Sequence, residues 1–113
     1  MILTRENDER VQKFIRDHKN PIVLYFTAHW CSSCKAIESI LEPLAAENVG
    51  LIHVLKIDVE HCPQTSARFL IRGLPTVILY WRDDVQNVIV GAKLADKNLY
   101  AELFTEKGDD VED

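Results

Sequence analysis

Residues 26–35 of this 113-residue chain have the sequence Phe-Thr-Ala-His-Trp-Cys-Ser-Ser-Cys-Lys, and this stretch decides the fold. It begins at the end of a continuous apolar run, Ile22–Phe26, which is typical of a strand covered on both faces. A helical pattern begins at Cys31 or shortly after it. The sequence therefore places Cys31 and Cys34 at a strand-to-helix junction, where a C-x-x-C pair strongly indicates thiol–disulfide chemistry.

The predicted position accounts for the reactivity of the first cysteine. At a helix start, the helix dipole and unpaired backbone N–H groups stabilise a thiolate, so we expect the pKa of Cys31 to lie below the free value of about 8.5. The two-residue spacing lets Cys34 reach back and resolve a mixed disulfide formed by Cys31. We also expect Cys34 to be the less exposed thiol, because it lies one helical turn further in.

Hydrophobic patterns on both sides of the junction predict a single α/β domain. The expected strands span residues 2–4, 22–26, 51–57, 76–81 and about 87–90. The expected helices span residues 6–17, about 31 to past 45, 63–70, and a last segment capped by Asp96 with Leu99, Leu103 and Phe104 as its apolar face. The order β-α-β-α-β-α-β-β-α implies a mixed sheet with helices on both faces.

The charge of the chain is concentrated at its C-terminal end. The formal net charge is −5, and residues 108–113 contribute four acidic side chains and no basic one. We therefore divide the chain into a domain over residues 1–107 and an acidic tail over residues 108–113, which we expect to be disordered. The domain itself is nearly neutral and has no basic stripe, so the sequence argues against nucleic-acid binding.

The sequence also argues against a membrane or secreted protein. The longest apolar run, Pro21–Phe26, is far too short to cross a bilayer. Met1–Thr4 leads directly into a charged stretch, so we expect no signal peptide. Three cysteines with two of them so close together do not form a secreted disulfide framework. The predicted location is a reducing compartment, the cytoplasm.

The third cysteine raises the alternative of a metal site. Cys62 and His61 could complete a tetrahedral zinc set with Cys31 and Cys34. Adjacent His-Cys is poor ligand spacing, however, so we predict neither a metal nor another cofactor. We interpret Cys62 as an exposed or half-buried bystander thiol, and a regulatory role through dimerisation or oxidation is the alternative.

Three segments resemble the thioredoxin family. Phe26–Lys35 is similar to its active-site segment, Ile71–Thr76 to its cis-proline loop, and Val90–Ala92 to its third substrate-facing loop. Element order and length match over residues 1–107. The resemblance implies the thioredoxin fold.

The resemblance also implies a substrate site. Pro75 would be cis and lie beside the sulfur of the first cysteine, and the backbone of Leu74 would pair with an extended substrate segment. Trp30, Gly73 and Gly91 would line a shallow apolar groove.

Two departures from the family pattern bear on the chemistry. Ser32-Ser33 stands where the family commonly has Gly-Pro, and their hydroxyls can stabilise a nearby thiolate. We therefore expect a reduction potential of about −180 to −240 mV, less negative than the roughly −270 mV of thioredoxin. Tyr25 stands where the family has a buried aspartate, and Val54 aligns with the lysine near it. A phenol with a pKa near 10 cannot act as a base, so the proton of Cys34 must leave through water or another group.

Two charged neighbours of the cysteine pair allow two interpretations each. His29 lowers the pKa of Cys31 when protonated, or it is a solvated loop residue. Lys35 supports the thiolate electrostatically, or it is a solvated helix residue.

The predicted function is a protein disulfide reductase in which Cys31 attacks and Cys34 resolves. Its expected partners are disulfide-containing protein substrates and a thioredoxin-reductase-like or other thiol electron donor, and we expect a monomer. The alternative is a binding module that recruits a protein through the groove between Trp30 and Pro75, with the cysteines incidental.

Overall fold

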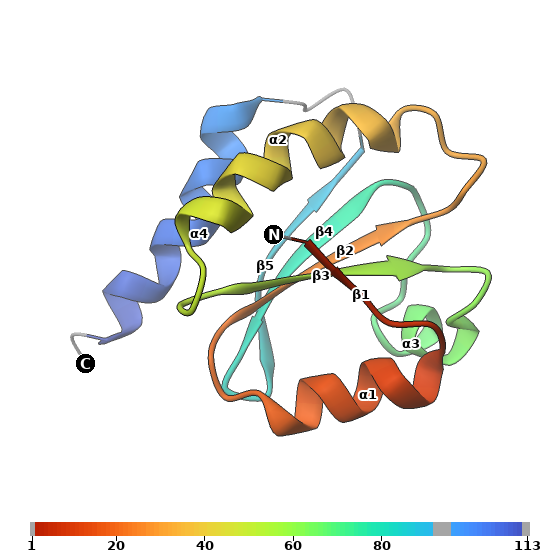
Figure 1. Ribbon diagram of the computed structural model, residues 1–113, viewed down its shortest axis with the longest axis horizontal. Helices are drawn as coiled ribbons and strands as arrows, with labels where there is room; N and C mark the ends of the chain where they lie inside the picture. The colour runs from red at the N-terminus through yellow and green to blue at the C-terminus, as the bar shows by residue number, and fades with distance from the viewer. Residues whose placement is uncertain (1, 92–95, 112–113) are drawn as a thin grey trace.

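A computed structural model describes residues 2–91 and 96–111 of the chain, with residues 106–111 described by their backbone alone. The chain forms three layers, a five-stranded sheet between two pairs of helices (Figure 1). The elements in chain order are β1 (Ile2–Thr4), α1 (Asp8–Asp17), β2 (Ile22–Thr27), α2 (Cys34–Glu47), β3 (His53–Asp58), α3 (Pro63–Arg68), β4 (Thr76–Trp81), β5 (Asp84–Val90) and α4 (Lys97–Val111). The predicted α/β class and element order are confirmed.

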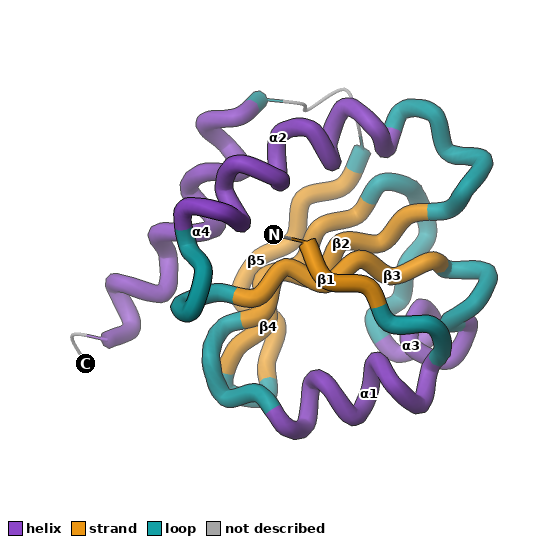
Figure 2. Tube along the Cα trace, viewed as in Figure 1, coloured by secondary structure: helices purple, strands orange, loops and turns teal. Residues whose placement is uncertain are grey.

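Strand β2 occupies the centre of the sheet. It pairs in parallel with β3 and antiparallel with β4 within the order β1-β3-β2-β4-β5. All six of its residues are buried, because helices cover both faces of the sheet (Figure 2). A strand in this position needs apolar residues without alternation, which is what the run Ile22–Phe26 predicted.

The two faces of the sheet carry separate hydrophobic clusters. Helices α2 and α4 cover one face, and α1 and α3 cover the other (Figure 1). Because side chains alternate along a strand, β2 sends Tyr25 into the first cluster and Phe26 into the second. The cysteine pair belongs to the first cluster, and Cys62 belongs to the second.

Helix α4 follows the predicted cap and apolar face. The carboxylate of Asp96 accepts a hydrogen bond from the N–H of Asn98 at 2.8 Å. Leu103 and Phe104 are buried as expected, whereas Tyr100, which the apolar pattern did not single out, is buried as well. The helix continues to Val111 and so includes part of the predicted tail, while residues 112–113 lie outside the described chain. No helix within the described ranges is both long enough and apolar enough to span a membrane.

Strand β3 begins two residues later than predicted. The N–H groups of Leu51 and Ile52 both donate to the carbonyl of Asn48, at 2.9 and 3.0 Å. This turn, which includes Gly50 at a φ of +87°, leaves the side chain of Leu51 exposed. The predicted start was therefore wrong because Leu51, although apolar, belongs to the turn before the strand.

Strand β5 begins earlier than predicted, at Asp84 rather than near residue 87. Arg82 and Asp83 both adopt positive φ, 56° and 60°, and form a tight two-residue hairpin turn. The start of β5 was not predicted because its residues are mostly polar. These residues are exposed, since β5 is an edge strand of the sheet.

Cys62 is buried, so the expectation of an exposed or half-buried thiol was wrong. Its side chain is fully covered within the cluster beneath α1 and α3. Burial, reinforced by nearby Asp8 and Asp58, raises the pKa of the Cys62 thiol to about 11. A covered thiol that stays protonated is a poor nucleophile, which argues against regulatory oxidation at this position.

Asp8 fixes helix α3 to helix α1. Its carboxylate accepts hydrogen bonds from the N–H of Thr65 at 2.7 Å, the hydroxyl of Thr65 at 2.8 Å and the N–H of Gln64 at 3.0 Å. Burial acts to raise the pKa of Asp8, but these hydrogen bonds outweigh it and lower the pKa overall. Asp8 therefore supplies the side-chain cap that Cys62, at the N-cap of α3, does not provide.

Replacing Asp8 with alanine is expected to lower the free energy of unfolding by about 1–2 kcal/mol at neutral pH, as for a lost helix cap. Because the pKa of Asp8 is lowered by folding, its contribution is present at neutral pH and is lost as the pH falls through and below about 4. Urea unfolding at several pH values checks this prediction. The difference in the free energy of unfolding between Asp8→Ala and the wild type should become smaller on acidification. The exposed control Glu9→Ala should differ little from the wild type at any pH.

Candidate active site

The cysteine pair lies between the end of β2 and the first turn of α2. Cys31 and Cys34 form a disulfide with their Cα atoms 5.4 Å apart. The N–H of Cys31 donates to the carbonyl of Ala28 at 3.0 Å, and the N–H of Cys34 donates to the carbonyl of Cys31 at 3.2 Å. The predicted strand-to-helix placement is confirmed, although α2 begins at Cys34 rather than nearer Cys31.

The two cysteines differ in their access to the surface. Cys31 is 8% exposed and Cys34 is 1% exposed, in the predicted order. Cys31 lines an open surface groove of about 500 Å³, whereas Cys34 does not reach it. The groove is lined by Trp30, Cys31, Ser32, Ser33, Val59, Ser66, Ile71, Arg72, Gly73 and Leu74.

Most residues expected at the substrate groove lie there. Trp30, Gly73 and Leu74 line it, and the Leu74–Pro75 peptide bond is cis, as the family resemblance implied. Gly91 is not part of the lining, and its N–H donates to the carbonyl of Pro75 at 2.9 Å. Of the third resemblance segment, Ala92 lies outside the described residues.

Glu60 holds the rim of the groove in place. Its Oε2 accepts a hydrogen bond from Trp30 Nε1 at 3.0 Å, and its Oε1 lies 3.1 Å from His29 Nδ1. The N–H of Glu60 donates in turn to the carboxylate of Asp58 at 2.8 Å. Trp30 remains 60% exposed, so this contact fixes a large apolar surface that faces solvent. Sequence reasoning did not identify Glu60, because its partners are about thirty residues away along the chain.

Ser33 is the hydroxyl nearest to the first cysteine. Its Oγ lies 3.5 Å from the sulfur of Cys31, within the range of a weak hydrogen bond to sulfur. Ser32 also lines the groove, and the described side-chain hydrogen bonds include none from its hydroxyl to either sulfur. The structure thus gives one of the two serines a contact suited to stabilising a thiolate.

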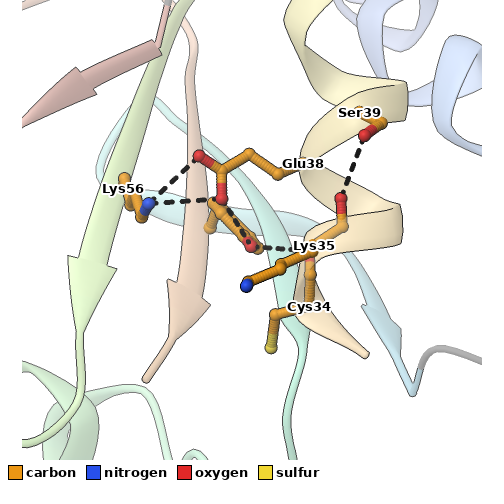
Figure 3. Close-up of polar contacts among 6 residues, drawn as sticks. Cys34, Lys35, Glu38, Ser39 and Lys56 are labelled. Atoms are coloured by element: carbon orange, nitrogen blue, oxygen red, sulfur yellow. Dashed lines mark hydrogen bonds and ion pairs between the residues drawn. The ribbon is translucent and has the colours of Figure 1, made fainter. Parts of the chain in front are cut away.

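A second, smaller cavity of about 280 Å³ lies on the inner side of the cysteine pair. Both cysteines line it, and the other lining residues are Thr27, Ala28, His29, Lys35, Glu38, Lys56 and Asp58. Glu38 extends from α2 toward Lys56 on β3, and the Lys56 ammonium lies 3.0 and 3.2 Å from the two carboxylate oxygens (Figure 3). Lys35 is exposed and contributes to the mouth of this cavity.

Tyr25 stands at the position where the family pattern has a buried aspartate. Its hydroxyl donates to the carbonyl of Cys34 at 2.9 Å and lies 3.4 Å from the Glu38 carboxylate. Burial raises the pKa of Tyr25 to about 12, so the phenol stays protonated. The aligned residue Val54 is buried, but Lys56 stands directly opposite Tyr25 in the β2–β3 register.

Glu38 and Lys56 are functional candidates that the sequence analysis missed. Glu38 follows Cys34 by four residues, which places both on the same face of a helix. Lys56 lies between the apolar residues Leu55 and Ile57 of its strand. Both signals were present in the sequence, but only the packing of α2 against β3 brings the two side chains together.

The cysteines do not assemble a metal site with Cys62 and His61. Cys62 lies in the cluster on the opposite face of the sheet from Cys31 and Cys34. Among the described residues, no group of three or more His, Cys, Asp or Glu side chains is arranged to hold a metal ion.

A C-x-x-C disulfide between a central strand and a helix, beside a cis-proline loop, defines a thiol–disulfide oxidoreductase. The family model for thioredoxin matches residues 2–103. The chain therefore belongs to the thioredoxin family.

Individual relatives agree with this assignment. Thioredoxin C-2 of Corynebacterium nephridii is 33% identical over 90 residues, covering 80% of this chain and 83% of the relative. A thioredoxin of Buchnera aphidicola subsp. Schizaphis graminum is 35% identical over 85 residues, covering 75% and 79% of the two chains. The crystal structure of the germline-specific thioredoxin Deadhead from Drosophila melanogaster matches with a TM-score of 0.81 and 27% identity, covering 94% and 98%.

The Glu60 contact predicts a measurable change in the motion of Trp30. In a Trp81→Phe background, Glu60→Ala should increase the amplitude of fast indole depolarisation in time-resolved fluorescence, because the indole N–H loses its acceptor. Stability should change by less than about 0.5 kcal/mol, since these side chains are largely exposed. An anisotropy decay identical to that of the control Glu47→Ala would show that Glu60 does not restrain Trp30.

Proposed function

We propose that this protein is a protein disulfide reductase in which Cys31 attacks the substrate and Cys34 resolves the mixed disulfide. The observation that carries the assignment of roles is the difference in access between the two sulfurs. Cys31 lines the open groove, whereas Cys34 is 1% exposed and is not among the residues that line it. A substrate disulfide approaching from solvent therefore meets Cys31 first.

The groove suits an extended protein segment with apolar side chains. Val59, Ile71 and Leu74 supply apolar surface, and the exposed indole of Trp30 adds to it. No hydrogen bond between described residues engages the backbone of Leu74, so its polar groups are available to pair with a substrate strand. We propose Trp30, Gly73, Leu74 and the adjoining Pro75 as the substrate-binding residues.

The exchange transfers two electrons to the substrate. The Cys31 thiolate attacks one sulfur of the substrate disulfide, and the other sulfur leaves as a thiolate. Cys34, deprotonated, then attacks the Cys31 sulfur, forms the intramolecular disulfide and releases the second substrate thiolate. The weak contact from Ser33 stabilises the thiolate at Cys31, which favours the reduced form and makes the potential less negative.

The cycle needs a partner that reduces the Cys31–Cys34 disulfide again. We propose a thiol electron donor of the thioredoxin-reductase kind, acting on a monomer in a reducing compartment such as the cytoplasm. The support is chemical, since a reductase must be recharged after each turnover and works where substrate thiols persist.

Cysteine variants test the assignment of roles through the reduction of insulin disulfides. Cys31→Ser should lower the rate to background, because the attacking sulfur is gone. Cys34→Ser should lose turnover but accumulate a covalent mixed disulfide with the substrate, seen by mass spectrometry. Cys62→Ala is the matched control and should retain the wild-type rate, because Cys62 lies on the other side of the sheet.

Turnover by Cys31→Ser would contradict the proposed roles. The same variants separate the reductase from a binding module that uses the groove without chemistry. A module would capture partners equally well when both Cys31 and Cys34 are replaced by serine, whereas the reductase captures them covalently through Cys31 alone.

A further inference from the structure

The inner cavity places a carboxylate within reach of the resolving cysteine. Cys34 and Glu38 lie one helical turn apart on α2, and both line this cavity of about 280 Å³. In the disulfide, the Cys34 sulfur is bonded to Cys31 and does not touch the carboxylate (Figure 3). A cavity of this size has room for several water molecules, and its charged lining residues can hydrogen-bond them, so water can link the two groups.

Lys56 and Tyr25 hold the Glu38 carboxylate where it is. The Lys56 ammonium contacts both carboxylate oxygens, and the two side chains are half-buried, 35% and 31% exposed. The Tyr25 hydroxyl lies 3.4 Å from the same carboxylate and donates to the carbonyl of Cys34. One hydroxyl thus connects the backbone of the resolving cysteine to the charged pair.

We propose that Glu38 accepts, through water in the inner cavity, the proton that the Cys34 thiol releases when it resolves the mixed disulfide. The inference rests on the proposed dithiol–disulfide exchange. The Cys34 proton moves to Glu38 as the Cys34 sulfur attacks Cys31. The bond from Cys31 to the substrate breaks, its electron pair leaves with the substrate thiolate, and the proton passes from Glu38 to that thiolate or to solvent. Lys56 is a positioning residue that keeps Glu38 aimed at the cavity.

Other groups around the cavity are less suited to accept this proton. The charged or titratable side chains that line it or pack against it are His29 from the loop, Tyr25 from β2, Lys35 from α2, Lys56 and Asp58 from β3, and Tyr100 from α4. A lysine ammonium group has no acceptor atom. Burial raises the pKa values of both tyrosines, so the two phenols stay protonated at neutral pH.

His29 and Asp58 are engaged at the outer end of the cavity. His29 lies against Glu60, and Asp58 accepts a hydrogen bond from the N–H of Glu60 and lies 3.9 Å from His61. His29 belongs to the loop before the cysteine pair and Asp58 is the last residue of β3, so neither shares the face of α2 that carries Cys34 and Glu38. Glu38 is the carboxylate on the same helix face as the thiol, and the contact with Lys56 holds it beside the cavity.

The pH dependence of the resolving step distinguishes a proton acceptor from a structural residue. With a carboxylate as the acceptor, the rate of resolution is proportional to the fraction of ionised carboxylate multiplied by the fraction of protonated thiol. It is therefore flat between the pKa of a carboxylate, about 4, and that of a thiol, about 8.5. Without a carboxylate acceptor, only the thiolate form of Cys34 attacks. The rate of resolution then rises about tenfold for each pH unit over this range.

The experiment uses the reduced full-length protein and an aromatic disulfide that releases a coloured thiolate. Stopped-flow absorbance gives a first phase, attack by Cys31, that depends on reagent concentration, and a second phase, resolution by Cys34, that does not. We expect Glu38→Gln to slow the second phase at least about tenfold near pH 6 and to convert its flat profile into a rising one. The first phase should be unchanged.

Two further variants complete the test. Glu38→Asp keeps a carboxylate and should retain the flat profile, even if the shorter side chain lowers the rate. Glu42→Gln removes the same charge from an exposed position one turn further along α2 and should behave as the wild type. A flat profile in Glu38→Gln, or a rising one in Glu42→Gln, would overturn the role of Glu38. A wild-type protein that releases only one equivalent of coloured thiolate, and so never resolves the mixed disulfide, would instead contradict the proposed function itself.

Discussion

The way strand β2 ends is the constraint on which the active site depends. β2 is buried on both faces and paired on both edges, so the chain can turn outward only after Thr27, whose carbonyl accepts a hydrogen bond from the N–H of Val59 at 2.9 Å. That bond brings the segment after β3, with Val59 and Glu60, to the groove. Helix α2 then fixes the cysteine pair through Ile37 and Leu41 in the core, which leaves one sulfur at the groove and the other at the inner cavity.

The charges near the resolving cysteine follow from the same arrangement. Strand β2 places Tyr25 beneath the disulfide, and among the side chains that the structure describes no carboxylate is buried in the core. A charged pair instead stands at the edge of the core, where Glu38 on α2 meets Lys56 on β3 in a half-buried position. Placing the pair there avoids most of the cost of burying charge and still keeps it beside the cavity. The phenol of Tyr25 contributes as a hydrogen-bond donor rather than as a base.

The sequence predicted the fold and the reactive centre well, because both are local. Each of three patterns predicts the local structure of its own segment: the continuous apolar run, the C-x-x-C pair and the Leu-Pro turn. The order of these segments along the chain predicts the topology. The features that the sequence analysis did not predict depend on contacts between residues far apart in the chain. Cys62 is buried because it packs into the hydrophobic cluster between the sheet and helices α1 and α3, and Glu60 meets Trp30 only when β2 and β3 are paired. Gly91, which was expected at the groove, is not among the lining residues, and its N–H donates to the carbonyl of Pro75 in the adjoining proline loop.

The equilibrium reduction potential of the Cys31–Cys34 couple tests the central claim most directly. Mass spectrometry of alkylated samples, equilibrated in a series of glutathione buffers, would follow the couple without interference from the buried Cys62. The account predicts a single reversible two-electron transition with a midpoint between about −180 and −240 mV, less negative than the roughly −270 mV of thioredoxin because Ser33 favours the reduced form. A midpoint above about −180 mV, or no reversible transition, would contradict a reductase.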